Sequence, residues 1–378
     1  MKAQKIIADK FGPAYVVEVS SSKPCFKGLL IIDNLAMGPG KGGIRMASGL
    51  NPFELFRLAR TMTWKNSLFD LPFGGAKAGI IIDPRKVSLK EKKEIIKEFA
   101  RLLAPFIPKY YIAGPDIGTA EQEMKWFAES LNNWKASTGK PASFCRRLKS
   151  GKVCGLPHEL GSTGFGVAKA TEVAASVLGL ELKGASVAIA GFGNVGSFAA
   201  KHLAEAGAKI VAVSETDGTI FNKDGLDLGL ITRLKEKGKS LTNYNKAKIL
   251  SRDRIYELPV DILIPAAVSD VINQKNYNKV KARIIVEGAN IPIPEKIEDR
   301  LWRKGIMIVP DFVANGGGVI SSFVEWSGRG PDIMFKIVEE KIKKATRQVL
   351  TESLKKKRNP RQIAFVLAKD NVLKAMNK

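Results

Sequence analysis

The sequence contains few cysteines and no long hydrophobic run. Its three cysteines, Cys25, Cys145 and Cys154, cannot all pair and follow no regular framework, which is typical of a reducing cytoplasm. No apolar run approaches the length of a membrane span, and the charged first fifteen residues lack the apolar core of a signal peptide. We therefore expect a cytoplasmic protein that uses no membrane partner.

Acidic residues are also scarce, because 61 lysines and arginines face 37 aspartates and glutamates, for a formal net charge of +24. The basic residues are spread along expected helix surfaces and do not cluster with aromatic residues in a nucleic-acid-reading module. We therefore expect no nucleic-acid partner. The positive charge would instead attract acidic metabolites by electrostatic steering.

The hydrophobic pattern predicts two α/β domains in 378 residues. A strand is expected at residues 26–33 and a helix at residues 51–71, where Asn51 is the N-cap. From Gly184 onward, short apolar strands alternate with helices, which is typical of a doubly wound parallel sheet. We place an N-terminal α/β domain at residues 1–155 and a Rossmann-type domain at residues 156–330, and we expect the helical segment 331–378 to pack on the first domain.

A glycine motif follows one of the predicted strands. Gly191, Gly193 and Gly196 come directly after the apolar strand 186–190 and open a helix expected at residues 195–206. Glycines at these positions permit a tight turn, close approach of a pyrophosphate, and close packing of the helix on the strand. The motif predicts a dinucleotide site.

Glu215 ends the next strand, 24 positions after Gly191. A carboxylate there can accept hydrogen bonds from both ribose hydroxyls and would repel a 2′-phosphate, which favours NAD over NADP. Lys209 or Lys223 could still fold toward a phosphate, so NADP stays open.

Three lysines lie in glycine-rich or apolar settings. Lys41 lies in GPGKGGIRM, Lys65 in MTWKN, and Lys77 in PFGGAKAG, just before a strand expected at residues 78–82. We interpret the surrounding glycines as room for a substrate and not as core packing. Converging ammonium groups would complement a small dianion and lower one another's pKa, which makes one of them a usable base. Asp116, which follows a proline in a loop, is a candidate proton carrier.

A metal site is not expected. Cys145, Cys154 and His158 lack an evident fourth ligand for a closed zinc site. His202 falls on the helix after the glycine turn and is expected to be structural.

The motifs GPGKGGIR, MTWKN, PFGGAKAG, GPDIGT, STGFGV, GFGNVG, IPAA, VEGAN and PDFVANGGG follow one another along nearly the whole chain. In this order they resemble the glutamate/leucine/phenylalanine/valine dehydrogenase family. The resemblance implies oxidation of an L-amino acid to its 2-oxo acid and ammonia, with hydride transfer to NAD or NADP. It also implies a homo-oligomer, hexamer or octamer, and catalysis as the two domains close.

The resemblance also assigns roles to residues. Lys77 would activate water against the iminium intermediate, Asp116 would move protons, and Lys65 would hold the substrate α-carboxylate. The full set of expected substrate-binding residues is Lys41, Lys65, Gly74, Gly75, Val319 and Ser322. The expected cofactor-binding residues are Thr163, Gly191, Gly193, Asn194, Val195, Gly196, Glu215, Ala266, Asn290 and Asn315.

Glutamate-specific members of this family have a lysine at the position of Lys41 and a serine at that of Ser322, so the resemblance implies glutamate as the substrate, with 2-oxoglutarate as its product. An ammonium at Lys41 and a hydroxyl at Ser322 can bind a γ-carboxylate, whereas a leucine side chain would leave both unpaired. The segment GLLIIDNLAMGP instead resembles the leucine-type enzymes, and Gly114 stands where the glutamate enzymes usually have alanine. Leucine or valine is therefore the second candidate. A catalytically silent metabolite sensor is a third, but loss of Lys77 or Asp116 would be its signature, and both are present.

Overall fold

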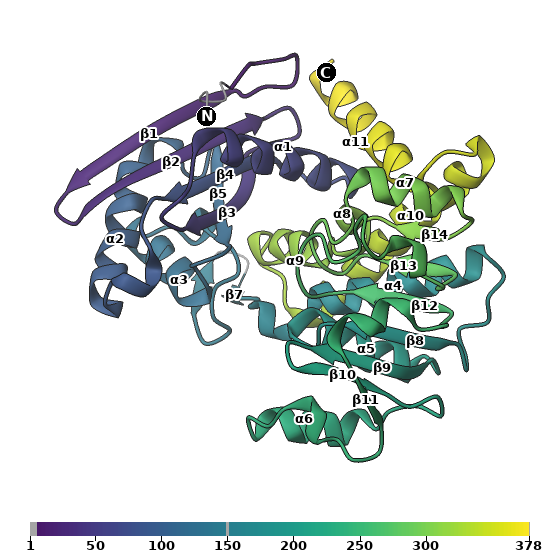
Figure 1. Cartoon of the computed structure of the whole chain (residues 1–378). Coiled ribbons are helices and arrows are strands. Elements are labelled where there is room, and N and C mark those ends of the chain that lie inside the picture. Colours follow the sequence, from purple (N-terminus) through teal and green to yellow (C-terminus); the bar gives the residue numbers. More distant parts are fainter. Residues whose placement is uncertain (1–5, 149–150, 378) are drawn as a thin grey trace. The chain divides into compact units, whose positions relative to one another are not determined.

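The computed structural model describes residues 6–148 and 151–377, which form two compact units (Figure 1). Unit 1 contains the described residues up to Leu160, residues Val319–Met334 and the chain from Phe365 onward, and unit 2 contains Gly161–Gly318 and Phe335–Ala364. This division differs from the predicted domains at the C-terminal segment. Residues 331–334 and the described chain from Phe365 onward belong to unit 1, whereas residues 335–364 belong to unit 2. Residues 319–330, placed in the Rossmann-type domain by the sequence, also belong to unit 1.

Unit 1 is built on a mixed five-stranded sheet in the order β1-β2-β4-β3-β5. Strand β3 runs parallel to β4 and β5, whereas β2 is antiparallel to β1 and β4. The strands are β1 (Tyr15–Ser22), β2 (Cys25–Asn34), β3 (Gly40–Met46), β4 (Gly74–Ile80) and β5 (Tyr111–Pro115). The strand expected at residues 78–82 therefore begins earlier and contains Lys77.

The helices of unit 1 cover both faces of this sheet. The predicted helix after Asn51 is confirmed, because the Asn51 side chain accepts a hydrogen bond from the backbone N–H of Glu54 at 2.9 Å. On one face, side chains of α2 and α3 pack against Ile44, Ala76 and Ala78 in the main hydrophobic core. The helices are α1 (Pro52–Leu68), α2 (Leu89–Leu102), α3 (Glu121–Ser130), most of α9 (Gly317–Trp326) and the later part of α11 (Pro360–Met376).

Helix α1 covers the opposite face of the sheet, where its Leu55 and Ala59 pack against Leu29 and Ile31 of β2. Glycines of β4 let it approach closely, since a Cβ built on Gly75 would lie 2.2 Å from Thr63 Oγ1. The expectation that these glycines serve no core packing is therefore wrong for Gly75, and its expected substrate contact stays a prediction.

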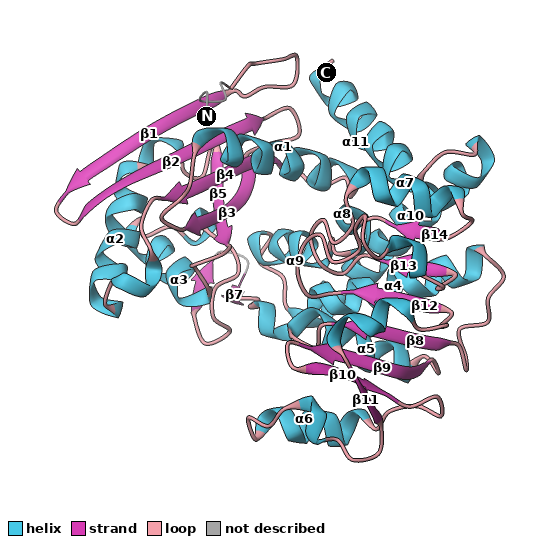
Figure 2. Cartoon of the chain, viewed as in Figure 1, coloured by secondary structure: helices cyan, strands magenta, loops and turns pink. Residues whose placement is uncertain are grey.

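Unit 2 contains a seven-stranded sheet in the order β11-β10-β9-β8-β12-β13-β14 (Figure 2). Five neighbouring strands are parallel, and β10 is antiparallel to β9 and β11. The strands are β8 (Ser186–Ala190), β9 (Lys209–Glu215), β10 (Gly218–Phe221), β11 (Lys248–Leu250), β12 (Ile262–Pro265), β13 (Ile284–Val286) and β14 (Met307–Val309). The predicted parallel, doubly wound sheet is confirmed.

The helices of unit 2 follow the predicted alternation with strands. Helix α5 directly follows the glycine turn after β8, and β12, β13 and β14 bring their carboxyl ends to the same edge as β8. The helices are α4 (Ser162–Val177), α5 (Asn194–Glu205), α6 (Leu228–Glu236), α7 (Glu295–Arg303), α8 (Asp311–Ala314) and α10 (Pro331–Lys356), the last of which belongs to unit 2 from Phe335.

Two of the three cysteines are paired in the structure, although their spacing showed no regular framework. A small hairpin of β6 (Cys145–Leu148) and β7 (Gly151–Cys154) places Cys145 directly opposite Cys154, and the two form a disulfide. Cys25 remains a free, exposed thiol. The sequence spacing could not reveal this pair, because it depends on the register of a hairpin whose strands are only four residues long.

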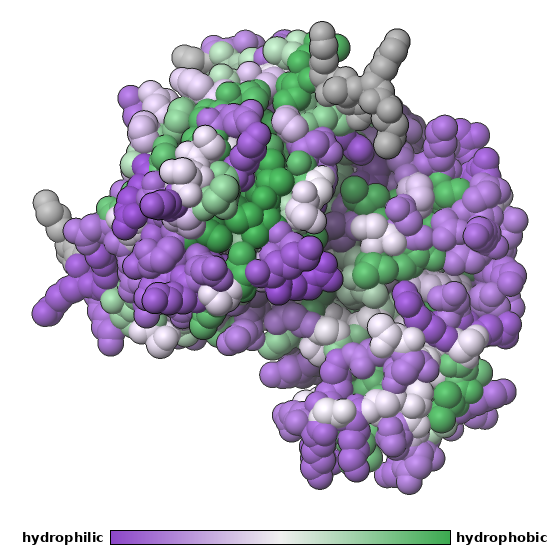
Figure 3. Space-filling model, turned by 60° about the vertical axis from the view of Figure 1, so that its left-hand side comes forward, coloured by the Kyte–Doolittle hydropathy of each residue, from purple (hydrophilic) through white to green (hydrophobic). Residues whose placement is uncertain are grey.

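The surface of unit 1 carries a band of hydrophobic residues on the face visible in Figure 3, within a largely hydrophilic surface. The edge strand β1 also exposes Tyr15 and Val16, to 40% and 51%. Across the described ranges, no helix is both long enough and apolar enough to span a bilayer.

Candidate active site

Three of the predicted residues lie on one face of the unit 1 sheet. Side chains alternate along a strand, and Lys41 is paired with Gly75 on β4, so Lys41 and Lys77 share a face. Gly43 is paired with Gly114 on β5, which brings Asp116, just beyond β5, to the same face. Helix α1 covers this face and carries Lys65 in its last turn.

Lys77 and Asp116, the two residues predicted to be catalytic, form an ion pair, with Lys77 Nζ 2.9 Å from Asp116 Oδ2. Arg45 Nε donates to the same oxygen at 2.9 Å, and Arg45 also pairs with Glu54 at 3.0 Å. The Asp116 backbone N–H donates to Thr119 Oγ1 at 3.0 Å. These contacts fix the carboxylate against the lysine.

Burial lowers the pKa of Lys77 below its ordinary value, and the charge of Asp116 only partly opposes the effect. Burial alone would raise the pKa of Asp116, but the charges of Lys77 and Arg45 outweigh it and hold that pKa below its ordinary value. The carboxylate therefore stays ionised while the amine deprotonates readily. This combination suits proton abstraction by Lys77.

Lys41 is a buried cation, only 4% exposed. Among the residues that the structure describes, none forms a hydrogen bond or ion pair with its ammonium. Burial lowers the pKa of Lys41 to about 7; Lys77 and Lys140 lower it further, and Glu325 opposes them. An anionic group from a ligand would supply the missing partner.

Gly114 provides the space that the Lys41 side chain uses. A Cβ built on Gly114 would lie 2.4 Å from Lys41 Nζ, closer than atoms pack in proteins. The ammonium therefore occupies the place where an alanine would put its methyl group. The sequence showed the unusual glycine but not its connection with Lys41.

A buried ion pair between Lys140 and Glu325 lies close enough to influence Lys41. Lys140 Nζ is 2.6 Å from Glu325 Oε1, and both side chains are fully buried. Glu325 Oε2 also accepts from the backbone N–H groups of Gly139 at 2.6 Å and Leu156 at 3.1 Å. Sequence reasoning missed this pair, because its two members lie 185 positions apart.

The other predicted substrate residues lie on α1, β4 and α9. Lys65 is half-buried, and Ser322 is half-buried on α9, one turn before Glu325. Gly74 and Gly75 are buried, and a Cβ on Gly74 would lie 1.8 Å from Asn34 O, so Gly74 also serves close packing. Val319 is also in unit 1, on α9.

The three glycines of the turn in unit 2 have three different surroundings. Gly191 has φ +102°, which a residue with a side chain rarely adopts. A Cβ on Gly196 would lie 1.9 Å from Gly191 O, so this glycine lets α5 pack on the turn. A Cβ on Gly193 would meet nothing within 4 Å, and no side chain caps α5 there. The open space at an uncapped helix N-terminus fits a pyrophosphate.

The remaining predicted cofactor residues gather at the carboxyl edge of the same sheet. Ala266 follows β12, and a Cβ on Gly288 would contact both Ala266 and Val195. Asn315 Nδ2 donates to Asn290 Oδ1 at 2.9 Å. Asn194 opens α5, and Thr163 lies in the first turn of α4, beside Gly317.

Glu215 ends β9 as predicted, but it is paired with Lys235 of α6, whose Nζ also donates to the Phe192 carbonyl at 2.8 Å. The cation near this carboxylate is thus Lys235 and not Lys209, which begins the same strand at its other end. The sequence offered no signal for it, because the contact depends on how α6 packs.

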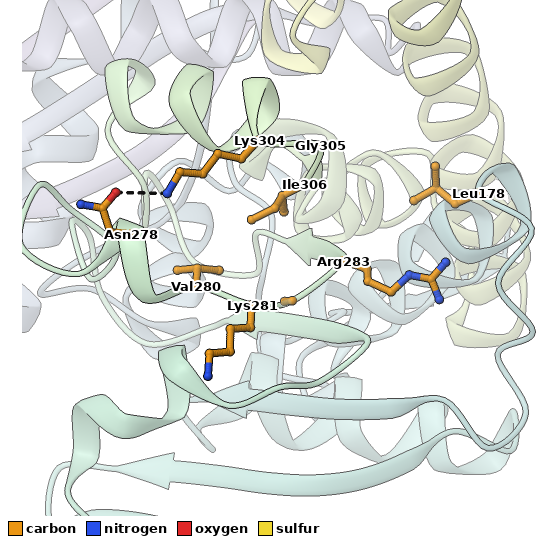
Figure 4. Close-up of a pocket in the computed structure, with 9 residues that line it drawn as sticks. Leu178, Asn278, Val280, Lys281, Arg283, Lys304, Gly305 and Ile306 are labelled. Carbon is orange, nitrogen blue, oxygen red and sulfur yellow. Dashed lines mark hydrogen bonds between the residues drawn. The ribbon is translucent and has the colours of Figure 1, made fainter.

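A depression of about 640 Å³ lies at the opposite edge of the sheet, where β13 and β14 begin (Figure 4). Lys304 donates to Asn278 at 3.1 Å, whereas Lys281 and Arg283 point in different directions. In open α/β sheets dinucleotides bind at the carboxyl edge, so this depression is separate from the cofactor site.

No group of three or more histidine, cysteine, aspartate or glutamate side chains is arranged to hold a metal within the described ranges. Cys145 and Cys154 bond to each other. His202 contacts Glu205 at 2.9 Å and stacks edge-on against Phe165, which is a structural role.

A glycine turn at a dinucleotide edge, together with a buried lysine–aspartate pair in a second α/β unit, defines a nucleotide-dependent oxidoreductase. Comparison with known proteins specifies the class. Residues 155–378 match the Glutamate/Leucine/Phenylalanine/Valine dehydrogenase family, and residues 15–133 match the Glu/Leu/Phe/Val dehydrogenase dimerisation domain. The chain belongs to this family and is an amino-acid dehydrogenase.

Its curated relatives include the glutamate dehydrogenase of Aeropyrum pernix, 38% identical over 91% of this chain and 84% of the relative. The NADP-specific glutamate dehydrogenase of Saccharolobus shibatae is 38% identical over 91% of this chain and 82% of the relative. Among solved structures, the leucine-bound hetero-hexameric glutamate dehydrogenase of Thermus thermophilus has a TM-score of 0.83 and 28% identity, covering 96% of this chain and 89% of that one.

Proposed function

We propose that the protein catalyses the reversible oxidative deamination of L-glutamate to 2-oxoglutarate and ammonia, with NAD or NADP as hydride acceptor. The observation that carries this proposal is the buried Lys41 ammonium, which no described residue pairs. A γ-carboxylate would satisfy it, whereas a leucine or valine side chain would leave a desolvated charge against hydrocarbon. The names of the curated relatives support the same substrate.

Lys65 would bind the α-carboxylate, and Ser322 would assist Lys41 at the γ-carboxylate. Asp116, held ionised by Lys77 and Arg45, would accept a proton from the substrate ammonium, leaving an amine. When bound, the nicotinamide ring accepts the hydride from the α-carbon. Neutral Lys77 would then take a proton from the water that adds to the resulting iminium carbon, and Asp116 would return a proton to the nitrogen of the adduct. As the carbon–nitrogen bond breaks, the hydroxyl proton would leave with the ammonia as ammonium, which gives the 2-oxo acid, and Lys77 would release its proton to solvent.

Cofactor binding would use the open space at Gly193 and the N-terminus of α5 for the pyrophosphate, with Asn290 and Asn315 at the edge of the sheet. Glu215 favours the ribose hydroxyls of NAD. Lys235, already paired with Glu215, offers a cation to a 2′-phosphate, so we propose a preference for NAD that still permits NADP.

We propose a homo-oligomer, either a hexamer or an octamer. The match to a dimerisation domain includes β1, whose outer edge pairs with no other strand in the part of the chain that the structure describes. An open edge exposing Tyr15 and Val16 suits pairing with a second copy. Sedimentation velocity would distinguish these assemblies from a monomer.

A metabolic dehydrogenase of this kind suits the cytoplasm. There the Cys145–Cys154 pair would be reduced, since disulfides are rare in reducing compartments. Counting alkylatable thiols in protein taken from cells would test this, with three expected from reduced protein and one from oxidised protein.

The deciding experiment measures NADH and NADPH formation with glutamate, leucine, valine and phenylalanine in parallel. Activity with glutamate above the others supports the proposal. Higher activity with leucine or valine would refute the role of Lys41. Bound cofactor without turnover on any of the four would instead indicate a metabolite sensor.

A further inference from the structure

A buried cluster in unit 2 centres on Arg361, at the start of α11. Its guanidinium donates to three carboxylates, with Nη1 2.9 Å from Asp311 Oδ1, Nη2 2.7 Å from Glu287 Oε2, and Nε in contact with Glu298. Asp311 and Arg361 are 5% and 7% exposed, and the two glutamates are fully buried. The planar guanidinium of arginine carries five N–H donors and can therefore bind three carboxylates at once.

Two of these carboxylates stand where neighbouring parallel strands end. Glu287 directly follows β13, and Asp311 opens α8 after β14. The Asp311 backbone N–H donates to Glu287 Oε2 at 2.8 Å, so the two strand ends are also joined directly. The cluster therefore lies on the carboxyl edge, which also carries the cofactor motif.

The second oxygen of Asp311 continues the chain of contacts. Asp311 Oδ2 accepts from the backbone N–H of Ile291 at 2.9 Å, next to Asn290. Asn290 Oδ1 in turn accepts from Asn315 Nδ2 at 2.9 Å, and the Asn315 N–H returns to the Asp311 carbonyl at 2.8 Å. Asp311 thus reaches both asparagines expected at the cofactor: its carboxylate holds the loop of Asn290 through the Ile291 N–H, and its backbone carbonyl accepts from the Asn315 N–H. Arg361 fixes the same carboxylate from the other side.

The loop that carries Asn290 needs such support. Ile291 has φ +50°, a left-handed conformation that a β-branched residue rarely adopts. A conformation of this kind persists only where its surroundings hold it. Here the Ile291 N–H binds Asp311 and its carbonyl accepts from Asp270 N–H at 3.0 Å.

We propose that Arg361 is a positioning residue for the cofactor: through Asp311 and Glu287 it holds Asn290 and Asn315 in the arrangement that binds the dinucleotide. The inference rests on the proposed NAD(P)-dependent function. Burial raises the pKa of Glu287, and that of Glu298 to about 7, so the cluster does not carry three full negative charges near neutral pH. The loops after β13 and β14 are therefore linked by the directed hydrogen bonds of the guanidinium to Glu287 and Asp311, and not by its charge alone.

The test is an Arg361→Lys variant of the full chain, titrated with NADH and NADPH by fluorescence. Lysine keeps the charge but cannot bridge three carboxylates. We expect about tenfold weaker cofactor binding, the size of one lost hydrogen bond, and a KM for glutamate at saturating cofactor within about twofold of wild type. A role confined to folding would lower the melting temperature and leave the dissociation constant unchanged.

Two matched variants separate positioning from stability. Glu298→Gln alters the same cluster but contacts neither asparagine loop, so cofactor binding should stay within about twofold of wild type. Arg60→Lys removes a comparable guanidinium bridge in unit 1, where Arg60 pairs with Asp9 and Asp33. This variant should lower the melting temperature and leave the cofactor dissociation constant unchanged. If Arg361→Lys does not fold, Asp311→Asn replaces it, with the same weakening expected.

Three results would overturn the inference. Unchanged cofactor affinity in folded Arg361→Lys or Asp311→Asn would refute positioning while leaving the proposed function intact. Equal weakening in Glu298→Gln would show that the cluster acts through general stability. Failure of the wild-type protein to bind either NADH or NADPH would refute the proposed function itself, and this inference with it.

Discussion

Replacing Lys41 with methionine should make the protein more stable and less active. In the folded chain, burial lowers the pKa of Lys41 from 10.5 to about 7. Because the unfolded state holds this proton more tightly, wild-type stability rises with pH between about 7 and 10.5, and the full cost is present below pH 7. Methionine has a similar shape and no charge, so Lys41→Met should gain on the order of 2–5 kcal/mol near pH 7.

The same change should remove the preference for glutamate. Truncating one partner of a buried ion pair costs about 2–5 kcal/mol, which corresponds to a fall in kcat/KM of about 30-fold to more than 10³-fold. Activity with leucine or norvaline should stay the same or improve, because the uncompensated charge is gone. In the wild type, the KM for glutamate should also rise above about pH 7 as Lys41 loses its proton.

Two assays measure these opposite effects. Thermal unfolding at pH 6, 8 and 10 should show a higher melting temperature for Lys41→Met than for wild type, by a margin that shrinks as the pH rises. NADH formation should show the lower kcat/KM with glutamate. Lys92→Met is the matched control, because Lys92 pairs with Glu123 between α2 and α3, away from the site. The reasoning is refuted if Lys41→Met keeps its preference for glutamate, or if it is less stable than Lys92→Met at pH 6.

Other changes test other parts of the two units. Lys77→Met should lower kcat by about 10²–10⁴-fold, with NADH affinity measured by fluorescence unchanged; weaker NADH binding would place Lys77 in a different role. Gly193→Val should leave the melting temperature unchanged, since the added atoms enter open space, yet weaken NADH binding by about tenfold or more. Lys235→Ala should reduce kcat/KM with NADP by about tenfold relative to NAD, and equal effects on both cofactors would remove Lys235 from 2′-phosphate binding.

Local signals in the sequence predicted the helices and the Rossmann-type unit well. Asn51 with Pro52 marked the start of α1, and the glycine spacing after an apolar strand marked β8 and α5. These signals are local, since a cap or a turn depends on residues a few positions apart. Lys77 and Asp116 were assigned catalytic roles from the resemblance and not from spacing, and the ion pair between them was not predicted.

Strand β3, which lies between β4 and β5, was not predicted, because its sequence GKGGIRM looks like a loop. Glycine ordinarily weakens a strand, but here a Cβ on Gly42 would lie 1.6 Å from the Ala76 carbonyl. Only close packing between strands explains such a residue. Lys140 with Glu325, and Arg361 with its three carboxylates, were missed for the same reason, since their partners lie 50 to 185 positions away.

The later part of α11 completes unit 1 from the far end of the chain. Ser67 at the end of α1 donates to the Ala368 carbonyl at 3.0 Å, and Asn371 returns a hydrogen bond to Ser67 O at 3.0 Å. These partners are separated by 301 and 304 positions. At a synthesis rate of about 5–20 residues per second, a nascent unit 1 waits about 15–60 seconds for the helix that finishes it. During that interval the surface of α1 that contacts α11 in the folded chain is exposed, and chaperones or another nascent copy can bind it.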